Sequence, residues 1–241
     1  RQLPLDERIA HLADPAFREK LKAEQPIHHR NPDAKRFTTS YDEMYPLDDA
    51  LSYEPGIKDS IAGLAEARGL EPLDVLMDTL AEQRQIIFFF GGYKGNLRPY
   101  FDNIARAHSV FGLSDGGAHC GVLCDASVPT YMLSYVARDR TVADTLPLEF
   151  IVHKMTQNTA SVFGLNDRGV IAPGYLADFN IIDYAKLQLE PPKMVYDLPG
   201  DGKRLIQKAN GYIATIKRGE VTFENGIATG ALPGKLLRGG T

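Results

Sequence analysis

The chain has 241 residues, of which 44% are hydrophobic and 24% are charged, and its formal net charge is −4. This length is enough for one large domain or two small ones with a buried core. The negative charge gives no electrostatic reason to expect a nucleic-acid partner. The longest apolar run, Ile86 to Phe90, is far shorter than the roughly 18 residues that a membrane span needs.

The two cysteines are too few for a disulfide framework, so we expect a reducing compartment and a cytoplasmic protein. The chain begins with Arg1 instead of methionine. We therefore expect either that the original N-terminus was removed or that the chain is a piece of a longer protein.

Helices dominate the predicted elements of the first half. Acidic residues in the first turn and apolar residues at helical spacing predict a helix that begins at Leu5, and Pro15 begins a second one. Ser60 can cap a third helix that ends at Gly69, and Pro72 fits the first position of a fourth. Residues 26–46 are polar and are predicted to form a loop with at most one short strand.

Two short apolar runs, Ile86–Phe90 and Ser109–Leu113, are predicted to be strands. Each is apolar on both faces, which is typical of parallel strands covered by helices. Helices are predicted at Pro99–Ala107, Thr130–Ala137, Pro147–Met155 and Thr159–Phe163. The alternation of strand and helix predicts an α/β fold.

The pattern changes after about Gly169. Strands are predicted at Ala177–Asp183, Tyr212–Lys217 and Val221–Phe223, with a hairpin turn between the last two. We expect two domains: residues 1–170 as an α/β portion with an inserted segment, and residues 171–241 as a small β module with a tail.

Asp115 follows the second apolar run directly and precedes Gly116 and Gly117. In a (β/α)₈ barrel, catalytic residues lie at the C-terminal ends of the strands, where this carboxylate would be. An aspartate before glycine also commonly begins a turn or caps a helix. Spacing alone leaves both interpretations open.

Further segments resemble one family. Leu148–Leu165 is similar to the last barrel helices of amidohydrolases, and Arg168–Phe179, with its Gly-x-x-Ala-Asp core, resembles the segment that leaves their barrel. Ile216–Gly226 and the Thr-Gly-x-x-Pro-Gly-x-x-x-Arg tail at Thr229–Arg238 resemble N-acyl-D-amino-acid deacylases. With the Asp115 segment, these blocks cover most of Ile57 to Arg238 in the expected order.

The resemblance implies the C-terminal part of a (β/α)₈ barrel followed by a β-sandwich module, in a zinc-dependent hydrolase of amide C–N bonds. It implies that Asp115 takes a proton from the attacking water and passes it to the leaving amine. Gly116 and Gly117 would give the substrate access to the backbone, and Asp115 would be the only candidate metal ligand in this chain.

The chain departs from the family in its histidines. Family members begin their barrel with a His-x-His pair of metal ligands, and none of the six histidines here forms such a pair. We therefore expect zinc in the complete enzyme and no zinc bound by this chain alone. The two predicted strands cannot close a barrel of eight, so their edges would be left unpaired. We expect the missing N-terminal half or self-association to cover these edges.

Two neighbouring residue types can also bind metals or line the pocket. His119 could contact substrate or cap the following helix, and the residues do not decide between these roles. Cys120 and Cys124 lack the paired spacing and the four ligands of a structural zinc site, which favours packing residues.

The leading hypothesis is a deacylase of N-acyl-D-amino acids, with a small-molecule substrate and neither nucleic acid nor membrane as a partner. A cyclic amidase similar to hydantoinase or dihydroorotase shares the barrel exit and the aspartate. A non-catalytic remnant that serves as an interaction domain is the alternative from a different class.

Overall fold

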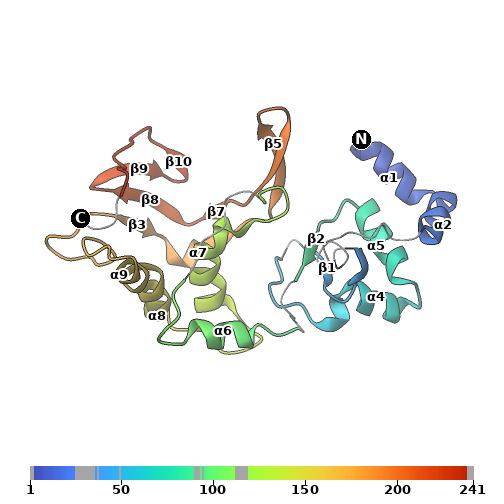
Figure 1. The fold of residues 1–241 in the computed structure, drawn as a ribbon, viewed down its shortest axis with the longest axis horizontal. Helices are drawn as coiled ribbons and strands as arrows, with labels where there is room; N and C mark the ends of the chain where they lie inside the picture. Colours follow the sequence, from blue (N-terminus) through green and yellow to red (C-terminus); the bar gives the residue numbers. More distant parts are fainter. Residues whose placement is uncertain are drawn as a thin grey trace. The chain divides into compact units, whose positions relative to one another are not determined.

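A computed structural model describes residues 3–24, 36, 38–48, 50–89, 93, 95–111 and 119–237. The chain divides into two compact units, residues 1–102 and 103–241 (Figure 1). The division predicted between residues 170 and 171 stays a prediction.

The first unit contains four of the predicted helices and one pair of strands. The described helices of its N-terminal part are α1 (Leu5–Ala13), α2 (Pro15–Ala23), the 3₁₀ turn η1 (Ile57–Asp59), α4 (Ile61–Arg68) and α5 (Pro72–Ala81). The strands are β1 (Met44–Pro46) and β2 (Ile86–Phe88). Helix α6 (Arg98–Ile104) continues across the end of this unit.

Local signals fix the ends of α4, as the sequence predicts. The Ser60 hydroxyl accepts a hydrogen bond from the Gly63 backbone N–H at 3.1 Å, which satisfies one of the free donors of the first turn. The helix ends at Gly69, whose φ of 66° is left-handed.

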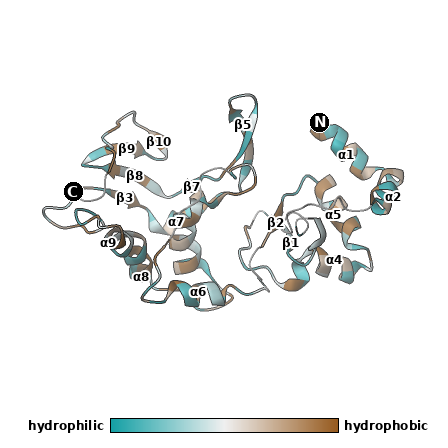
Figure 2. Ribbon diagram, in the orientation of Figure 1, coloured by the Kyte–Doolittle hydropathy of each residue, from teal (hydrophilic) through white to brown (hydrophobic). Residues whose placement is uncertain are grey.

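The core of the first unit joins β1 to α4 and α5. Met44, Ile61, Ala65 and Val75 form one buried cluster, with Ile86 among the residues packed against it. Both α4 and α5 carry hydrophobic and hydrophilic residues (Figure 2), so one side of each helix can face this cluster and the other can face solvent.

The expectation of a parallel strand at Ile86–Phe90 is wrong for the residues that the structure describes. Strand β2 covers Ile86–Phe88 and pairs antiparallel with β1, with Tyr45 opposite Ile87. Its three side chains are only half-buried. The apolar run is therefore explained by packing against α4 and α5 on one side and by an aromatic group at its end.

The aromatic group consists of Tyr45, Phe89 and Tyr93. Phe89 and Tyr93 stack with ring centroids 4.2 Å apart, and Tyr45 meets both edge-on. The Tyr93 hydroxyl donates to the Pro55 carbonyl at 2.8 Å, whereas the buried Tyr45 hydroxyl has no hydrogen-bond partner among the described residues. Burial raises the pKa of both phenols.

The second unit begins with helices. They are the 3₁₀ turn η2 (Asp125–Ser127), α7 (Val128–Tyr131), the π-helical stretch η3 (Met132–Asp139), α8 (Leu148–His153), the π-helical stretch η4 (Lys154–Asn158) and α9 (Thr159–Val162). These elements confirm the helices predicted over residues 130–163, and Gly164 ends the last one with a φ of 68°.

Strands follow the helices in chain order. They are β3 (Phe179–Ile182), β4 (Gln188–Leu189), β5 (Lys193–Leu198), β6 (Gly202–Ile206), β7 (Ala209–Asn210), β8 (Tyr212–Lys217), β9 (Glu220–Glu224) and β10 (Ile227–Ala228), with a short 3₁₀ turn η5 (Tyr184–Lys186) after β3. Four form an antiparallel sheet in the order β10-β9-β8-β3. The predicted strands at 177–183, 212–217 and 221–223 are confirmed.

The predicted hairpin turn between β8 and β9 is also confirmed. Arg218 and Gly219 both have positive φ, at 54° and 81°, which is the backbone of a two-residue type I′ turn. Hydrogen bonds join β8 and the turn η5 to the helices of this unit: Thr130 Oγ1 lies 2.9 Å from the Tyr212 hydroxyl, and the Tyr184 hydroxyl donates to Leu133 O at 3.1 Å.

Ser109–Phe111 do not form the predicted strand, and Gly112 and Leu113 lie outside the described residues. The backbone turns just before them, at residues 106–109, where the Ser109 N–H donates to Arg106 O at 3.2 Å. Across the described parts of the chain, no helix has the length and hydropathy of a membrane span.

Removal of the hydroxyl group should have opposite effects on the free energy of unfolding at Tyr45 and at Tyr93. Tyr45→Phe removes a buried hydroxyl that lacks a described partner, so the free energy of unfolding should rise by about 1 kcal/mol. Tyr93→Phe removes a hydrogen bond and leaves the Pro55 carbonyl without it, so that free energy should fall by about 1 kcal/mol. Urea denaturation followed by circular dichroism measures both; a loss of stability in Tyr45→Phe contradicts the prediction.

Candidate active site

The predicted catalytic residue Asp115, with Gly116 and Gly117, lies outside the described residues. The described chain stops at Phe111 and resumes at His119. Two described segments flank residues 112–118 in the sequence: the entering segment, residues 103–111, and the leaving segment, residues 119–127.

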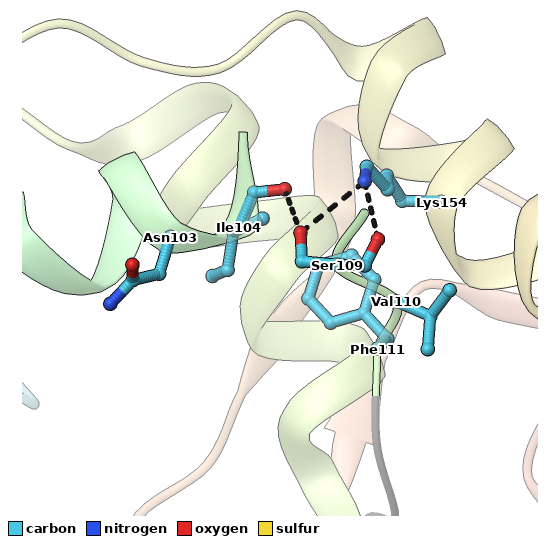
Figure 3. Close-up of a pocket in the computed structure, with 6 residues that line it drawn as sticks. All are labelled: Asn103, Ile104, Ser109, Val110, Phe111 and Lys154. Atoms are coloured by element: carbon cyan, nitrogen blue, oxygen red, sulfur yellow. Dashed lines mark hydrogen bonds between the residues drawn. The ribbon is translucent and has the colours of Figure 1, made fainter. Parts of the chain in front are cut away.

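The entering segment borders a small cavity of about 180 Å³. Its lining consists of Asn103, Ile104, Ser109, Val110, Phe111 and Lys154 (Figure 3). Most of the lining surface is apolar, and Lys154 reaches in from a helix 45 residues further along the chain than Ser109.

Lys154 is the one buried cation of this lining, and its side chain points toward Ser109 (Figure 3). The ammonium donates to the Ser109 carbonyl at 2.6 Å and to the Arg106 carbonyl at 2.8 Å. Ser109 Oγ lies 3.4 Å away, and the Phe150 ring centroid 5.6 Å away. The residue is only 4% exposed.

The approach of Lys154 to Ser109 resembles a Ser–Lys nucleophile and base, but the contacts do not fit that role. A general base needs a free lone pair, and this nitrogen directs its donors at three oxygens. The Ser109 hydroxyl is itself 2.9 Å from Ile104 O and 2.8 Å from Arg106 O. The group is a fixed set of donors and acceptors that holds residues 104–109 together.

Sequence reasoning missed Lys154, although a signal was present. Lys154 follows the fully buried Ile151 by three residues, so both share the inward face of the helix. A lysine in an apolar stripe indicates a buried charge that needs partners.

The leaving segment, residues 119–127, is held by strand β6 and the residue that follows it. Leu205 N–H donates to the Cys120 carbonyl at 2.6 Å, and Ser127 Oγ donates to Gln207 Oε1 at 2.6 Å. Gln207 Nε2 in turn donates to the Glu190 carbonyl at 2.9 Å. The C-terminal strands therefore fix the chain just after residues 112–118.

His119 is exposed and begins a turn, because its carbonyl accepts the backbone N–H groups of Val122 and Leu123 at 2.9 Å each. The next helical turn begins only at Asp125, and His119 is not among the residues that line the described cavity. Its predicted contact with substrate stays a prediction.

The metal-binding residue types do not form a described metal site. Cys120 and Cys124 are both free and half-buried, and burial, with the nearby Asp125 charge, raises the pKa of the Cys124 thiol. Over the described ranges, no group of three or more His, Cys, Asp or Glu side chains could hold a metal ion. These residues therefore do not fit the zinc that the sequence resemblance implies.

Asp178, the aspartate of the Gly-x-x-Ala-Asp motif, has a structural position. Its carboxylate pairs with Lys217 and accepts the Arg218 backbone N–H at 2.8 Å, with Arg168 3.9 Å away. Burial raises its pKa, but the hydrogen bonds from Lys217 and Arg218 and the charges of Lys217 and Arg168 outweigh burial and lower the pKa overall. The motif thus fixes the turn between β8 and β9.

Comparison with known proteins agrees with the motifs. The family model of the amidohydrolases matches residues 35–223. The chain belongs to the amidohydrolase family. This confirms the resemblance stated from the sequence at the level of the family.

The curated relatives are longer than this chain. Uncharacterized proteins of Mycobacterium bovis and Mycobacterium tuberculosis are 28% identical over 187 residues, which is 75% of this chain and 28% of theirs. The chain thus spans less than a third of the length of these relatives. Crystal structures of D-aminoacylase match with a TM-score of 0.42 and 23% identity, over 78% of this chain and 36% of theirs.

The lowered pKa of Asp178 predicts how pH affects stability. A carboxyl with a depressed pKa stabilises the fold above its unfolded value of about 3.9, and this contribution disappears as pH falls through the folded value. Asp178→Asn should therefore lower the free energy of unfolding by about 1 kcal/mol at pH 7. Urea denaturation between pH 7 and pH 3 should show the difference from the parent shrinking below about pH 4.

The control is Asp197→Asn, which removes the exposed pair with Arg204 on the β5–β6 hairpin. Exposed pairs contribute little, so this change should have a much smaller effect. Equal losses at pH 7, or a difference for Asp178→Asn that stays constant to pH 3, would contradict the structural role of Asp178.

Proposed function

We propose that the complete protein containing this chain is a hydrolase of non-peptide amide C–N bonds that deacylates N-acyl-D-amino acids. The observation that carries the proposal is family membership over residues 35–223, joined to the order of the motifs along the chain. The Thr229–Arg238 tail favours the D-amino-acid deacylases within that family, because it resembles their closing segment.

Asp115 would be the general acid–base group. Its carboxylate would take a proton from water while the water oxygen attacks the carbonyl carbon of the amide. The C–N bond would then break, and the same proton would pass to the nitrogen of the leaving amine. The products would be a carboxylate and a free amino acid.

The residues after Asp115 suit an approach of substrate to the backbone. Gly116 and Gly117 carry no side chains that would block an acyl group, and His119 follows them on an exposed turn. The zinc in this proposal would be bound by parts of the complete protein other than the described residues of this chain.

The first test of the proposal concerns metal. The 241-residue chain, purified alone, should hold no stoichiometric zinc and should show no deacylase activity, because zinc takes three or four protein ligands. Elemental analysis and an assay with N-acetyl-D-leucine measure this. One tightly bound zinc per chain would contradict the prediction.

The second test concerns Asp115 in the complete protein. Asp115→Asn keeps the size of the side chain but cannot take up a proton at neutral pH, so kcat should fall by roughly 100-fold or more. Folding and metal content should stay close to those of the parent. Turnover within a few-fold of the parent would mean that Asp115 is a turn residue and not the acid–base group.

A further inference from the structure

The ammonium of Lys154 is buried against neutral oxygens. The residue is 4% exposed, and its short hydrogen bonds go to the carbonyls of Arg106 and Ser109, at 2.8 and 2.6 Å. Among the residues that the structure describes, no carboxylate forms an ion pair with it. A buried charge without a counter-ion is costly, because neutral oxygens replace only part of the hydration that the charge has lost. The position therefore favours the binding of an anion.

One of the three ammonium hydrogens has no short hydrogen bond. The third contact of Lys154, to Ser109 Oγ, is 3.4 Å long. The Ser109 hydroxyl has acceptors of its own, because the carbonyls of Ile104 and Arg106 lie 2.9 and 2.8 Å away. A carboxylate oxygen accepts from an ammonium at about 2.8 Å and binds it roughly twice as strongly as a neutral acceptor does. Such an oxygen would replace the long contact and leave both carbonyl contacts in place.

The space beside this ammonium is the cavity of about 180 Å³, most of whose lining surface is apolar (Figure 3). Ile104, Val110 and Phe111 supply apolar side chains, and Lys154 is the one charged residue of the described lining. An apolar cavity of about 150 Å³ can hold a molecule of the size of benzene. Val110 is 37% exposed, so a ligand can enter from solvent on its side. The cavity therefore suits a small ligand with an apolar chain and one negative charge.

We propose that this cavity binds a small monocarboxylic acid with a short branched chain. Its carboxylate would accept a hydrogen bond from the Lys154 ammonium, and its chain would pack against Ile104, Val110 and Phe111. A neutral compound of the same shape lacks the charge interaction, and a dicarboxylic acid would place its second charge against apolar side chains, which is costly. The inference is independent of the proposed deacylation, because every residue that carries it belongs to the described cavity.

The experiment follows the backbone amide signals of the 241-residue chain by NMR during titration with isovalerate at constant ionic strength. Isovaleramide, which has the same shape without the charge, and isopentylamine, which has the opposite charge, are titrated in parallel. Isovalerate should shift signals of residues 103–111 and 150–158 and saturate with a Kd of about 1 mM, a value within the range for a ligand of so few atoms. Isovaleramide should bind roughly tenfold more weakly. Isopentylamine should cause no saturating shift.

Two pairs of variants separate the charge of the site from its shape. Lys154→Met removes the charge with little change in side-chain length and should abolish saturation by isovalerate. Its control, Lys186→Met, removes a lysine of the same unit whose side chain is 80% exposed, and should leave the Kd unchanged. Val110→Asp places a negative charge beside the ligand, whereas Val110→Asn places a neutral side chain of the same size there. Val110→Asp should therefore weaken binding about tenfold more than Val110→Asn does.

The Val110 variants also guard against a failure of Lys154→Met to fold. Their side chain is partly exposed, so neither change buries a new polar group completely. Circular dichroism verifies the fold of each variant before titration. If Lys154→Met is unfolded, the comparison of Val110→Asp with Val110→Asn decides whether the ligand's negative charge lies in this cavity.

Several results would overturn the inference. Isovalerate that fails to saturate any signal at concentrations far above the expected Kd removes the site. Equal affinity for isovaleramide, or an unchanged Kd in a folded Lys154→Met variant, removes the role of the ammonium. Equal weakening by Val110→Asp and Val110→Asn, or shifts confined to signals outside residues 103–111 and 150–158, places any binding elsewhere.

Discussion

The buried ammonium of Lys154 sets the arrangement of the second unit around residues 104–111. Helix α8 and the π-helical stretch after it bring this charge inward beside Ile151, and the charge must be solvated by protein oxygens. The carbonyls of Arg106 and Ser109 supply that solvation, so the segment turns toward the helix and does not extend as a strand. One electrostatic requirement thus links the last helices to the chain that leads to Asp115.

The C-terminal strands have a related part in the same unit. Asp178 collects Lys217, Arg168 and the Arg218 backbone N–H, which fixes the type I′ turn and the register of β8 with β9. In the same unit, β6 and Gln207 hold residues 120–127. The C-terminal strands, which the sequence marks only by motifs, therefore also contact the described segment that follows residues 112–118.

Sequence reasoning succeeded where the signals were local. The caps at Ser60 and Gly69 act within one helical turn, so the ends of α4 could be predicted from neighbouring residues alone. The predictions for the two apolar runs failed because the structure of these runs depends on residues distant in the sequence. Ile86–Phe88 pairs with β1, 40 to 44 residues earlier, in a stretch predicted to be a loop with at most one short strand, and Ser109 is held by Lys154 45 residues later. Neither partner can be inferred from spacing.

The candidate catalytic residue shows the same division between motif and geometry. Asp115 could be selected from the sequence alone, because its segment lies among motifs that follow one another in the order typical of the family. Whether a carboxylate works as a general base depends on its placement within about 3 Å of the proton it takes. That placement depends on the folded surroundings of the segment, which an order of motifs along the chain does not specify.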